Sequence, residues 1–292
     1  MTSRMVSAVV LTLLVLAAPL VAAAQEPGVL VTPEWLRDRL RDPAVRVVDM
    51  TTEPEDYQKG HVPGAVYLHV NDARIGVPAG GFRLPNEDEA ARLLGALGIT
   101  PSTTVVIYDD SGGLHASRLF FTLEVFGHTR VVLVDGGIQA WRRAGFPTTR
   151  ETPAITPTTY RPRVTADRVV SAEWVRDRLA DTTVTLVDAR TPAEFSGRDV
   201  RARRGGHIPG AVNVEWREHL KSDMRFKPVS ELSALYRGRG VTPDKTVVTY
   251  CQTHHRAAHT YFVLRLLGYP RVAGYDRSWV EWGNRDDLPV AK

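Results

Sequence analysis

The 292-residue chain contains a single cysteine, Cys251, and its neighbours place it where a nucleophile would be activated. Residues 246–250 form a short run of β-branched and aromatic side chains typical of a buried strand. Apolar residues then recur at three- and four-residue steps up to Gly268, which predicts a helix that ends there. A turn from a strand into a helix N-terminus gathers backbone N–H groups and favours an anion. With the positive charge of Arg256, this turn would hold Cys251 as a nucleophilic thiolate; the alternative is a small buried core thiol.

Three histidines near Cys251 raise the question of a metal site. His255 and His259 are four residues apart, as ligands on one helix face can be, and Cys251 could be a further ligand. However, Arg256 directly follows His255, and a guanidinium between two ligands opposes the binding of a cation. We therefore predict no metal. His254 and His255 should line the pocket as neutral or partly charged donors, and His259 should pack within the helix.

An internal repeat supplies the elements that must position this loop. The paired segments follow one another in the same order, namely residues 32–40 and 171–179, 45–49 and 184–188, 60–65 and 206–211, 104–108 and 246–250, and 135–141 and 276–282. Apolar strands that alternate with helices predict a parallel sheet with helices on both faces, so we expect an α/β fold of two duplicated domains. The domains should span residues 29–147 and 167–292, joined by an extended proline-rich linker over residues 148–166.

The loop Cys251-Gln-Thr-His-His-Arg256, the strands that end in Asp and the two Gly-His-x-Pro-Gly-Ala turns resemble the rhodanese family of sulfurtransferases. The loop is most similar to that of bacterial thiosulfate sulfurtransferases. The resemblance implies two rhodanese-like domains, with the active site facing the cleft between them. It also implies that Cys251 takes sulfane sulfur from thiosulfate as a persulfide and passes it to cyanide or a thiol, without a cofactor. The substrate-binding residues would then be Gln252, Thr253, His254, His255, Arg256 and Arg190.

The two copies differ at the position that matters for this chemistry. Asp109 in the first copy corresponds to Cys251, and a carboxylate cannot form a persulfide. The first domain should therefore be catalytically inert and form one wall of the cleft, as the resemblance implies. In the second copy, Arg190 matches a family position that acts mainly in a structural ion pair and less often in substrate contact. Glu194 stands where the family often has a substrate-binding arginine.

Several residues of the second copy allow two interpretations. Arg256 could hold an anionic donor, or it could pair with a neighbouring carboxylate to fix the loop. An insertion before Gly206 carries arginines within residues 198–204, which could form a solvated loop or a rim that attracts anions. Trp216 and Trp279 could line the cleft or pack in the core.

Three other functions compete with a thiosulfate sulfurtransferase. A 3-mercaptopyruvate sulfurtransferase would share the fold and the cysteine, but the loop of that family is small and rich in Gly and Ser. A phosphatase is disfavoured because four residues separate Cys251 from Arg256, whereas the related dual-specificity phosphatases have five. A non-enzymatic sulfur carrier or sulfide-binding module is an alternative of a different class.

The first 24 residues are predicted to be a cleavable export signal. Arg4 precedes an apolar run over residues 5–20, and small residues before Gln25 offer a cleavage site after Ala24. The mature protein should therefore be periplasmic or secreted and free of the membrane, and with one cysteine it has no internal disulfide. A net charge of +4 without a basic stripe argues against nucleic acid and for small anionic substrates such as thiosulfate. We expect a monomer.

Overall fold

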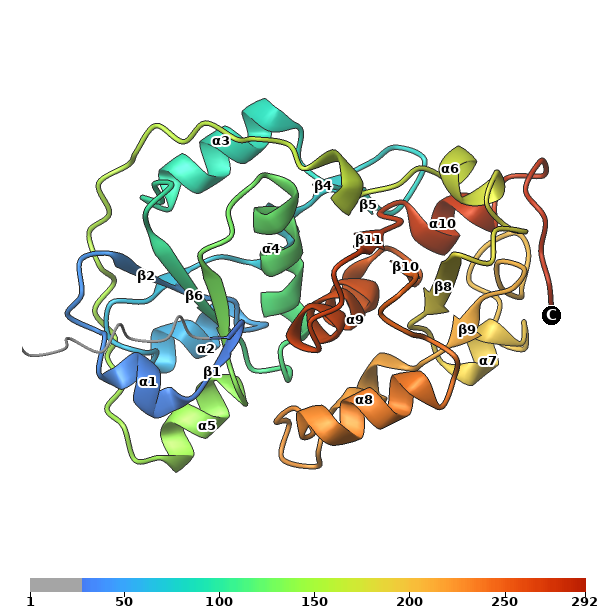
Figure 1. Cartoon of the computed structure of the whole chain (residues 1–292). Coiled ribbons are helices and arrows are strands. Elements are labelled where there is room, and N and C mark those ends of the chain that lie inside the picture. The colour runs from blue at the N-terminus through green and yellow to red at the C-terminus, as the bar shows by residue number, and fades with distance from the viewer. Residues whose placement is uncertain (1–27) are drawn as a thin grey trace, which may run out of the picture.

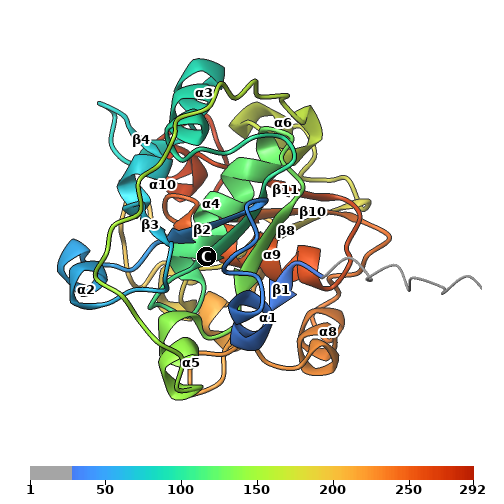
Figure 2. The same cartoon turned by 90° about the vertical axis from the view of Figure 1, so that its left-hand side faces the viewer.

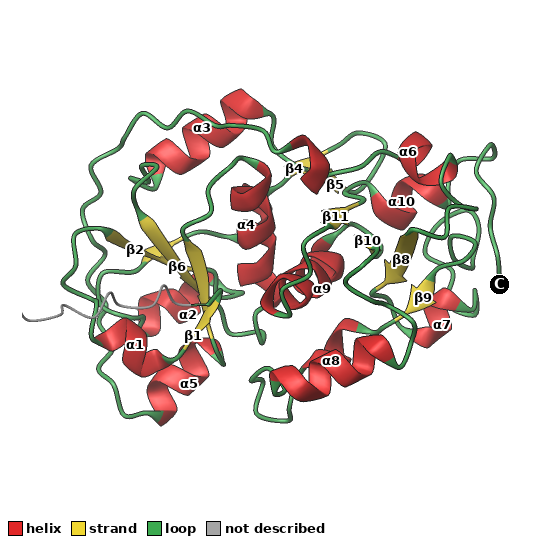
Figure 3. Cartoon of the chain, viewed as in Figure 1, coloured by secondary structure: helices red, strands yellow, loops and turns green. Residues whose placement is uncertain are grey.

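The structure is a computed structural model that describes residues 28–292, so the predicted signal peptide lies outside the described residues. Two α/β domains lie side by side (Figure 1), each with helices packed around a parallel sheet (Figure 3). The expected fold class is thus confirmed. Within residues 28–292, no helix is both long enough and apolar enough to cross a membrane.

The first domain is built on a five-stranded parallel sheet. Its strands occur in the spatial order β1 (Leu30–Val31), β7 (Val131–Val134), β6 (Thr104–Tyr108), β2 (Val45–Asp49) and β3 (Val66–Tyr67). Its helices are α1 (Pro33–Arg37), α2 (Pro54–Lys59), α3 (Glu87–Ala96), α4 (Leu114–Val125) and α5 (Gly137–Arg143), with a 3₁₀ turn η1 (Val70–Ala73). A small antiparallel hairpin of β4 (Ile75–Gly76) and β5 (Phe82–Arg83) projects from it.

The second domain repeats this plan on a four-stranded parallel sheet. Its strands occur in the order β11 (Val272–Gly274), β10 (Thr246–Tyr250), β8 (Val184–Asp188) and β9 (Val212–Asn213). Its helices are α6 (Ala172–Arg176), α7 (Pro192–Phe195), α8 (Val229–Arg237), α9 (His255–Leu266) and α10 (Ser278–Trp282), with 3₁₀ turns η2 (Ala166–Arg168) and η3 (Trp216–His219).

The elements on either side of Cys251 agree with the sequence prediction. Strand β10 covers residues 246–250, and α9 ends just before Gly268, whose positive φ of 76° suits a helix C-terminus. In the sheet, Tyr250 lies beside Asp188, so β10 and β8 end at the same edge. Ligands of parallel sheets bind outside the carboxyl ends of the strands, and Cys251 follows directly at that edge.

Helices α4 and α9 pack against each other between the two sheets (Figures 1 and 2). In α4 every residue from 115 to 125 is buried, and in α9 every residue from 257 to 264. The rings of Phe120 and Phe262 meet edge to face with their centroids 5.0 Å apart. One hydrophobic cluster contains Val105 of β6 and Val247 of β10, so the two domains share a core.

Buried polar contacts reinforce this interface. Arg118 of α4 forms an ion pair of 2.7 Å with Asp276, and both side chains are almost completely buried. Glu124 of α4 accepts a hydrogen bond of 2.6 Å from the hydroxyl of Tyr261 and pairs with Arg265 at 3.1 Å. Charges that are buried in this way are costly to separate, because each would lose its partner without regaining water.

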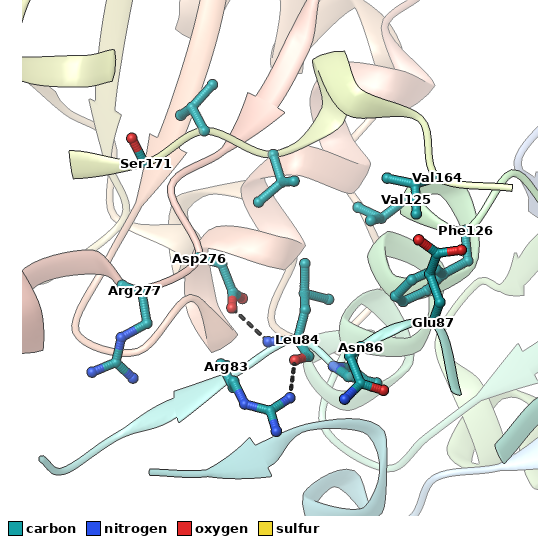
Figure 4. Close-up of a pocket in the computed structure, with 13 residues that line it drawn as sticks. Arg83, Leu84, Asn86, Glu87, Val125, Phe126, Val164, Ser171, Asp276 and Arg277 are labelled. Atoms are coloured by element: carbon teal, nitrogen blue, oxygen red, sulfur yellow. Dashed lines mark hydrogen bonds between the residues drawn. The ribbon is translucent and has the colours of Figure 1, made fainter. Parts of the chain in front are cut away.

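The β4–β5 hairpin adds a second connection between the domains. The N–H of Leu84, just after β5, donates to the Asp276 carboxylate at 2.6 Å, and Arg277 donates to the carbonyl oxygen of Phe82 at 2.9 Å. Figure 4 shows Leu84, Asp276 and Arg277 in a largely apolar pocket of about 670 Å³ at the domain boundary. Residues 251–256 do not line this pocket, so it is separate from the loop of Cys251. Through its hydrogen bond to Phe82, Arg277 joins the β4–β5 hairpin to the second domain.

The segment between the domains runs along the first domain (Figure 2). Residues 148–165 contain no helix or strand longer than a single bridge. The N–H of Thr158 donates to Gly95 at 2.9 Å, and the N–H of Arg163 donates to Phe126 at 3.1 Å. These backbone contacts hold the extended segment against α3 and the end of α4.

Candidate active site

The loop after β10 forms an open cradle of backbone donors around Cys251. Within residues 28–292, no acceptor lies opposite the backbone N–H groups of residues 252–256. The carbonyl oxygens of Cys251 and Gln252 are turned away, because they accept hydrogen bonds of 3.0 Å from Trp279 and Val280 of α10. The N–H of Cys251 donates to Ser278 Oγ at 3.2 Å. Free donors at a helix N-terminus make this loop suited to an anion.

A pocket of about 480 Å³ opens onto this cradle. Cys251 lies at its inner end and is only 1% exposed. The first domain contributes Leu114, and the other lining residues come from the second domain, namely Thr191, Arg201, Glu215, Trp216, Arg217, Cys251, Gln252, Thr253, His255 and Arg256. The pocket therefore lies at the domain boundary, as the resemblance implied.

Arg256 takes the second of its two expected roles. Its two terminal nitrogens donate to the two carboxylate oxygens of Glu194 at 2.7 and 2.8 Å, in a paired geometry that is strong and directional. Burial opposes the charge on Glu194, but the hydrogen bond and charge of Arg256 outweigh it and hold the pKa of this carboxyl at about 2. Burial works against the charge on Arg256 as well, and Glu194 compensates by raising the pKa of the guanidinium. The pair fixes the loop to α7.

The two histidines of the loop point to different places. His255 lines the pocket as predicted. His254 does not, which corrects the sequence prediction for this residue: its ring is fully buried, 3.3 Å from Thr249 Oγ1 and 3.4 Å from a nitrogen of Arg118. The positive φ of 55° at His254 turns its side chain inward. Burial lowers the pKa of His254 to about 3, so the ring is neutral.

Gln252 and Thr253 line the pocket, whereas Arg190 does not. The amide of Gln252 donates to the carbonyl oxygen of Arg201 at 2.9 Å. Arg190 is buried in an ion pair with Asp188 at 2.5 Å and also donates to the carbonyl oxygen of Gly206 at 2.8 Å. Its guanidinium lies 4.5 Å from the centre of the Trp279 ring. This is the structural ion pair that the family resemblance favoured.

Besides Arg256, the arginines that line the pocket are Arg201 and Arg217, and Glu215 adds a carboxylate to the same rim. Of the arginines in residues 198–204, Arg201 lines the pocket; it is paired with Asp199 at 2.7 Å, and its side chain is 51% exposed. Arg203 pairs with Asp286, and Arg204 donates to backbone carbonyls of the C-terminal segment. The insertion is thus mostly structural, with one arginine at the rim.

Trp216 and Trp279 lie in different environments. Trp216 lines the pocket and is 7% exposed, whereas Trp279 is 1% exposed and packs in the core of the second domain. Trp216 begins η3, which brings Arg217 to the same rim. The guanidinium of Arg217 lies 5.5 Å from the centre of the Trp216 ring.

His259 packs inside the protein. Its Nε2 lies 3.1 Å from the carbonyl oxygen of Gly112, and its Nδ1 lies 3.2 Å from Nδ1 of His219. Tyr236 completes this buried chain with a hydroxyl 2.8 Å from His219 Nε2. Burial lowers the pKa of His259 to about 4. Among the described residues, no group of three or more His, Cys, Asp or Glu side chains is arranged to hold a metal ion.

The corresponding loop of the first domain has its cradle filled. The carboxylate of Asp109 accepts hydrogen bonds from the backbone N–H groups of Ser111, Gly113, His115 and Ala116, at 2.8 to 3.0 Å. Asp109 is 1% exposed. The donors that surround Cys251 in the second domain are here satisfied by the side chain of the loop itself.

The sequence did not reveal three residues that line the pocket, nor a fourth that contacts one of its lining residues. Leu114 comes from the other domain, and its role depends on how the domains dock. Glu215 and Arg217 flank Trp216, and the aromatic residue was the only signal of that rim segment. His115, next to Leu114, contacts His255 from the first domain.

Comparisons with known proteins agree with this architecture. The model of the rhodanese-like domain family matches residues 32–144 and again residues 171–285. Thiosulfate sulfurtransferase of Azotobacter vinelandii is 37% identical over 260 residues, which cover 89% of this chain and 96% of that protein. Thiosulfate sulfurtransferase of Pseudomonas aeruginosa is 38% identical, with 89% and 96% covered. The sulfur carrier protein TtuD of Thermus thermophilus is 38% identical, with 91% and 97% covered.

A solved structure shows the same arrangement of the whole chain. The anaerobic ergothioneine biosynthesis enzyme from Chlorobium limicola aligns with a TM-score of 0.81 at 25% sequence identity, covering 90% of this chain and 70% of that chain. The family model matches twice, in the order in which the sequence repeats, and the relatives match over nearly their whole length. The chain therefore belongs to the rhodanese family, as a tandem of two rhodanese-like domains.

Proposed function

We propose that this protein is a thiosulfate sulfurtransferase in which Cys251 carries the sulfur. The observation that supports it most directly is the cradle of unpaired N–H groups around the only cysteine, at the inner end of a pocket with arginines at its rim. The relatives from A. vinelandii and P. aeruginosa carry this activity in their names.

The first half-reaction loads the cysteine. The thiolate of Cys251 attacks the outer sulfur of thiosulfate, a new S–S bond forms, and the bond inside thiosulfate breaks so that sulfite leaves with its electron pair. The cysteine then holds a persulfide. The N–H groups of residues 252–256 face the anionic sulfur and stabilise it in the way an oxyanion hole stabilises a developing charge. Arg201 and Arg217 attract the dianionic donor and the departing sulfite.

The second half-reaction unloads the cysteine. An acceptor, either cyanide or a thiol, attacks the outer persulfide sulfur, and the electron pair of the broken S–S bond returns to Sγ of Cys251. Two displacements at sulfur replace one direct transfer, which is covalent catalysis with ping-pong kinetics.

The test is steady-state kinetics of the purified protein with thiosulfate and cyanide, combined with intact-mass measurement. We expect parallel lines in double-reciprocal plots and the gain of one sulfur atom after incubation with thiosulfate alone, lost again on addition of cyanide. A mass that does not change with thiosulfate would reject the proposal.

Kinetic measurements on the same purified protein distinguish two alternative functions. The 38% identity to a sulfur carrier protein favours a carrier as the second candidate. A carrier would be loaded with sulfur but would turn over slowly with free small acceptors.

A 3-mercaptopyruvate sulfurtransferase would prefer 3-mercaptopyruvate as the donor, whereas we expect thiosulfate to be favoured at least ten-fold in kcat/KM, about 1.4 kcal/mol. Because Arg256 is neutralised by Glu194, this preference is expected to come from the rim and the N–H cradle.

We also propose that the protein is exported, on the basis of the apolar segment and the small residues that end at Ala24. N-terminal sequencing of the protein from its native host tests this. A mature chain that begins at Gln25 is expected, and a cytoplasmic chain that retains Met1 would contradict it.

A further inference from the structure

His115 of the inert domain reaches across the domain boundary into the catalytic loop. It is the second residue of α4, and its Nδ1 lies 3.0 Å from Nε2 of His255. The two ring centroids are 4.9 Å apart. His255 lines the pocket of Cys251, so His115 stands directly behind a residue that faces the substrate.

The hydrogen bonds behind His115 determine which nitrogen carries its proton. Thr52 Oγ1 donates its single hydrogen to Asp110 Oδ1 at 2.8 Å, because a carboxylate only accepts. Thr52 Oγ1 is also 3.2 Å from Ser111 Oγ and from Nε2 of His115. Because its contact with the carboxylate is the shortest of the three, we assign its hydrogen to Asp110, so that Thr52 Oγ1 accepts from His115. His115 therefore carries its proton on Nε2 and offers a lone pair at Nδ1.

This assignment passes on to the second ring. Since Nδ1 of His115 accepts, Nε2 of His255 must donate, and a neutral imidazole has one N–H. Nδ1 of His255 then carries a lone pair, and no described residue from 28 to 292 donates to it. Since the Nε2 edge of the ring is turned to His115, we assign Nδ1 to the side that faces the pocket, as an acceptor and not the donor that the sequence suggested.

The surroundings keep both rings neutral. Burial lowers the pKa of His255 far below its ordinary value, and the nearby His115, Arg74, Arg118 and Arg256 lower it further. Burial is also the largest influence on His115 and lowers its pKa; Arg74 and His69 act in the same direction, whereas Asp109 and Asp110 oppose it. Both rings therefore remain hydrogen-bond acceptors at neutral pH.

We infer that His115 is a positioning residue that directs the lone pair of His255 toward the sulfur acceptor and so adapts the second half-reaction to a neutral thiol. The inference rests on the proposed function. Thiosulfate and sulfite carry no proton to give, so an acceptor nitrogen gains nothing from them. A thiol at neutral pH is mostly protonated, and because the deprotonated sulfur is the stronger nucleophile, a base that takes the proton during the attack speeds the reaction.

The proton and the electrons balance without another reagent. The thiol sulfur forms a bond to the outer sulfur of the persulfide while its proton moves to Nδ1 of His255. The S–S bond to Cys251 breaks, and its electron pair returns to Sγ. The proton leaves with the product, which is the persulfide of the acceptor. A weak base suffices, because the attacking sulfur becomes strongly acidic as it gives up its electron pair.

The test compares two half-reactions in two variants at one position. His115→Leu removes the acceptor nitrogen, whereas His115→Gln retains an amide oxygen that can accept from His255. In a ping-pong reaction, kcat/KM for each substrate reports its own half-reaction. We expect His115→Leu to lower kcat/KM for a neutral thiol about ten-fold, the lower end of what outer-shell partners contribute. In His115→Leu, kcat/KM for thiosulfate as donor and for sulfite as acceptor should change less than about two-fold, because neither substrate has a proton to give. In His115→Gln, most of the kcat/KM for the neutral thiol should be restored.

Two further variants test the path behind His115 and protect against a folding defect. Thr52→Val removes the acceptor for His115 Nε2, and we expect the same selective loss with thiols. Ser111→Ala removes a hydroxyl that contacts Asp110 and Thr52 but not His115, and it serves as the matched control. An equal loss with thiosulfate and thiol, or no loss with thiol in either His115→Leu or Thr52→Val, would overturn the inference.

A readout that does not depend on turnover separates this inference from the proposed function. The ¹⁵N chemical shifts of the histidine rings report the tautomer. In the unmodified protein His255 should carry its proton on Nε2, and in His115→Leu this preference should be lost. If thiosulfate never loads Cys251, the proposed function fails whatever the tautomer. A wild-type His255 with its proton on Nδ1 would reject the positioning role even if turnover is normal.

Discussion

The two corresponding loops of the molecule are anchored to the fold in the same way but differ in the side chain at their centre. In both, the carbonyl oxygen of the first loop residue accepts a 3.0 Å hydrogen bond from the helix after the last strand: Ile138 to Asp109 and Trp279 to Cys251. In the first loop the carboxylate of Asp109 accepts from four backbone N–H groups. In the second loop, no acceptor among residues 28–292 is paired with the N–H groups of residues 252–256. The anion cradle thus belongs to the fold, and the residue at its centre decides whether it is occupied or reactive.

The loops also differ in length and in support. Helix α4 begins five residues after Asp109, whereas α9 begins four residues after Cys251. Only the second loop contains an arginine that is paired to a neighbouring helix, through Glu194 of α7. The second loop is shorter, and the ion pair between Arg256 and Glu194 fixes it, so its backbone N–H groups can point inward without a carboxylate at the centre. The space that a carboxylate would occupy is then available to sulfur.

The largest expected effect comes from exchanging the central residues. Cys251→Ala should lower thiosulfate turnover by about four orders of magnitude or more, because the nucleophile is gone. Adding Asp109→Cys to that variant should not restore turnover, since the first loop is longer and its centre lies outside the pocket. Steady-state kinetics and intact mass after thiosulfate treatment check both. Sulfur loading of the double variant would show that the central residue alone distinguishes the loops.

Removing the support of the second loop should have the next largest effect. Glu194→Gln leaves Arg256 without its anion, and we expect kcat/KM for thiosulfate to fall about 100-fold as the donors lose their alignment. Unfolding in urea should show a loss of up to about 3 kcal/mol, because one partner of a largely buried pair has been removed. Glu194→Asp is the control that retains the charge.

The same pair should make stability depend on pH in a defined window. The pKa of Glu194 is about 2 in the folded protein, below its ordinary value of 4.5. The pair therefore contributes fully above pH 4.5, and its contribution is lost as the pH falls from 4.5 through 2. The difference in unfolding free energy between wild type and Glu194→Gln should shrink across that range. A difference that is the same at pH 7 and pH 3 would contradict the pairing.

A smaller effect is expected at the rim. Arg201→Gln should lower kcat/KM for thiosulfate several-fold at low ionic strength, and the loss should fade with added salt as screening shortens the reach of the charge to about 10 Å at 0.1 M. Arg203→Gln is the matched control, because Arg203 lies in the same insertion and is likewise paired with a carboxylate but does not line the pocket. Equal losses in the two variants would mean that the arginines act through the structure of the insertion.

The smallest effect on turnover is expected in the first loop. Asp109→Ala should leave thiosulfate kinetics within about three-fold of wild type, because the carboxylate is outside the pocket; it should cost about 1–3 kcal/mol of stability, because buried N–H groups lose their acceptor. Urea unfolding and kinetics on one preparation measure both. A large loss of turnover without a loss of stability would assign the first loop a direct part in the reaction.

Much of the fold could be predicted because its signals are local. The strand before Cys251 and the helix after it are read from periodicity within ten residues or so. The two domains followed from the similarity of whole segments between the two halves of the chain. The nucleophile followed from its position at a strand-to-helix turn. The parallel sheets followed from the alternation of apolar strands with helices.

The residues that were misplaced, left with two possible roles or missed make contacts that are distant in the sequence or depend on unusual backbone geometry. His254 was expected in the pocket, but its left-handed backbone conformation turns it toward Thr249. The partner of Arg256 is Glu194, 62 residues earlier, and nothing in the loop itself chooses between a substrate and a carboxylate. The role of His115 requires the docking of α4 against α9, which no local pattern encodes.

The packing of α4 against α9 makes the two domains depend on each other. Residues 115–125 of α4 and 257–264 of α9 are all buried, so over these residues neither helix keeps the solvent-exposed polar face that the outer wall of a free-standing domain would need. A fragment truncated to residues 167–292 would expose Tyr261 and Phe262 to water, and we expect it to aggregate. Deletion of the domain that carries Asp109 would therefore remove the partner of α9, and we expect the domain without a cysteine to be required for the folding of the other. We also expect its loop to tolerate substitution better than the buried residues of α4 do.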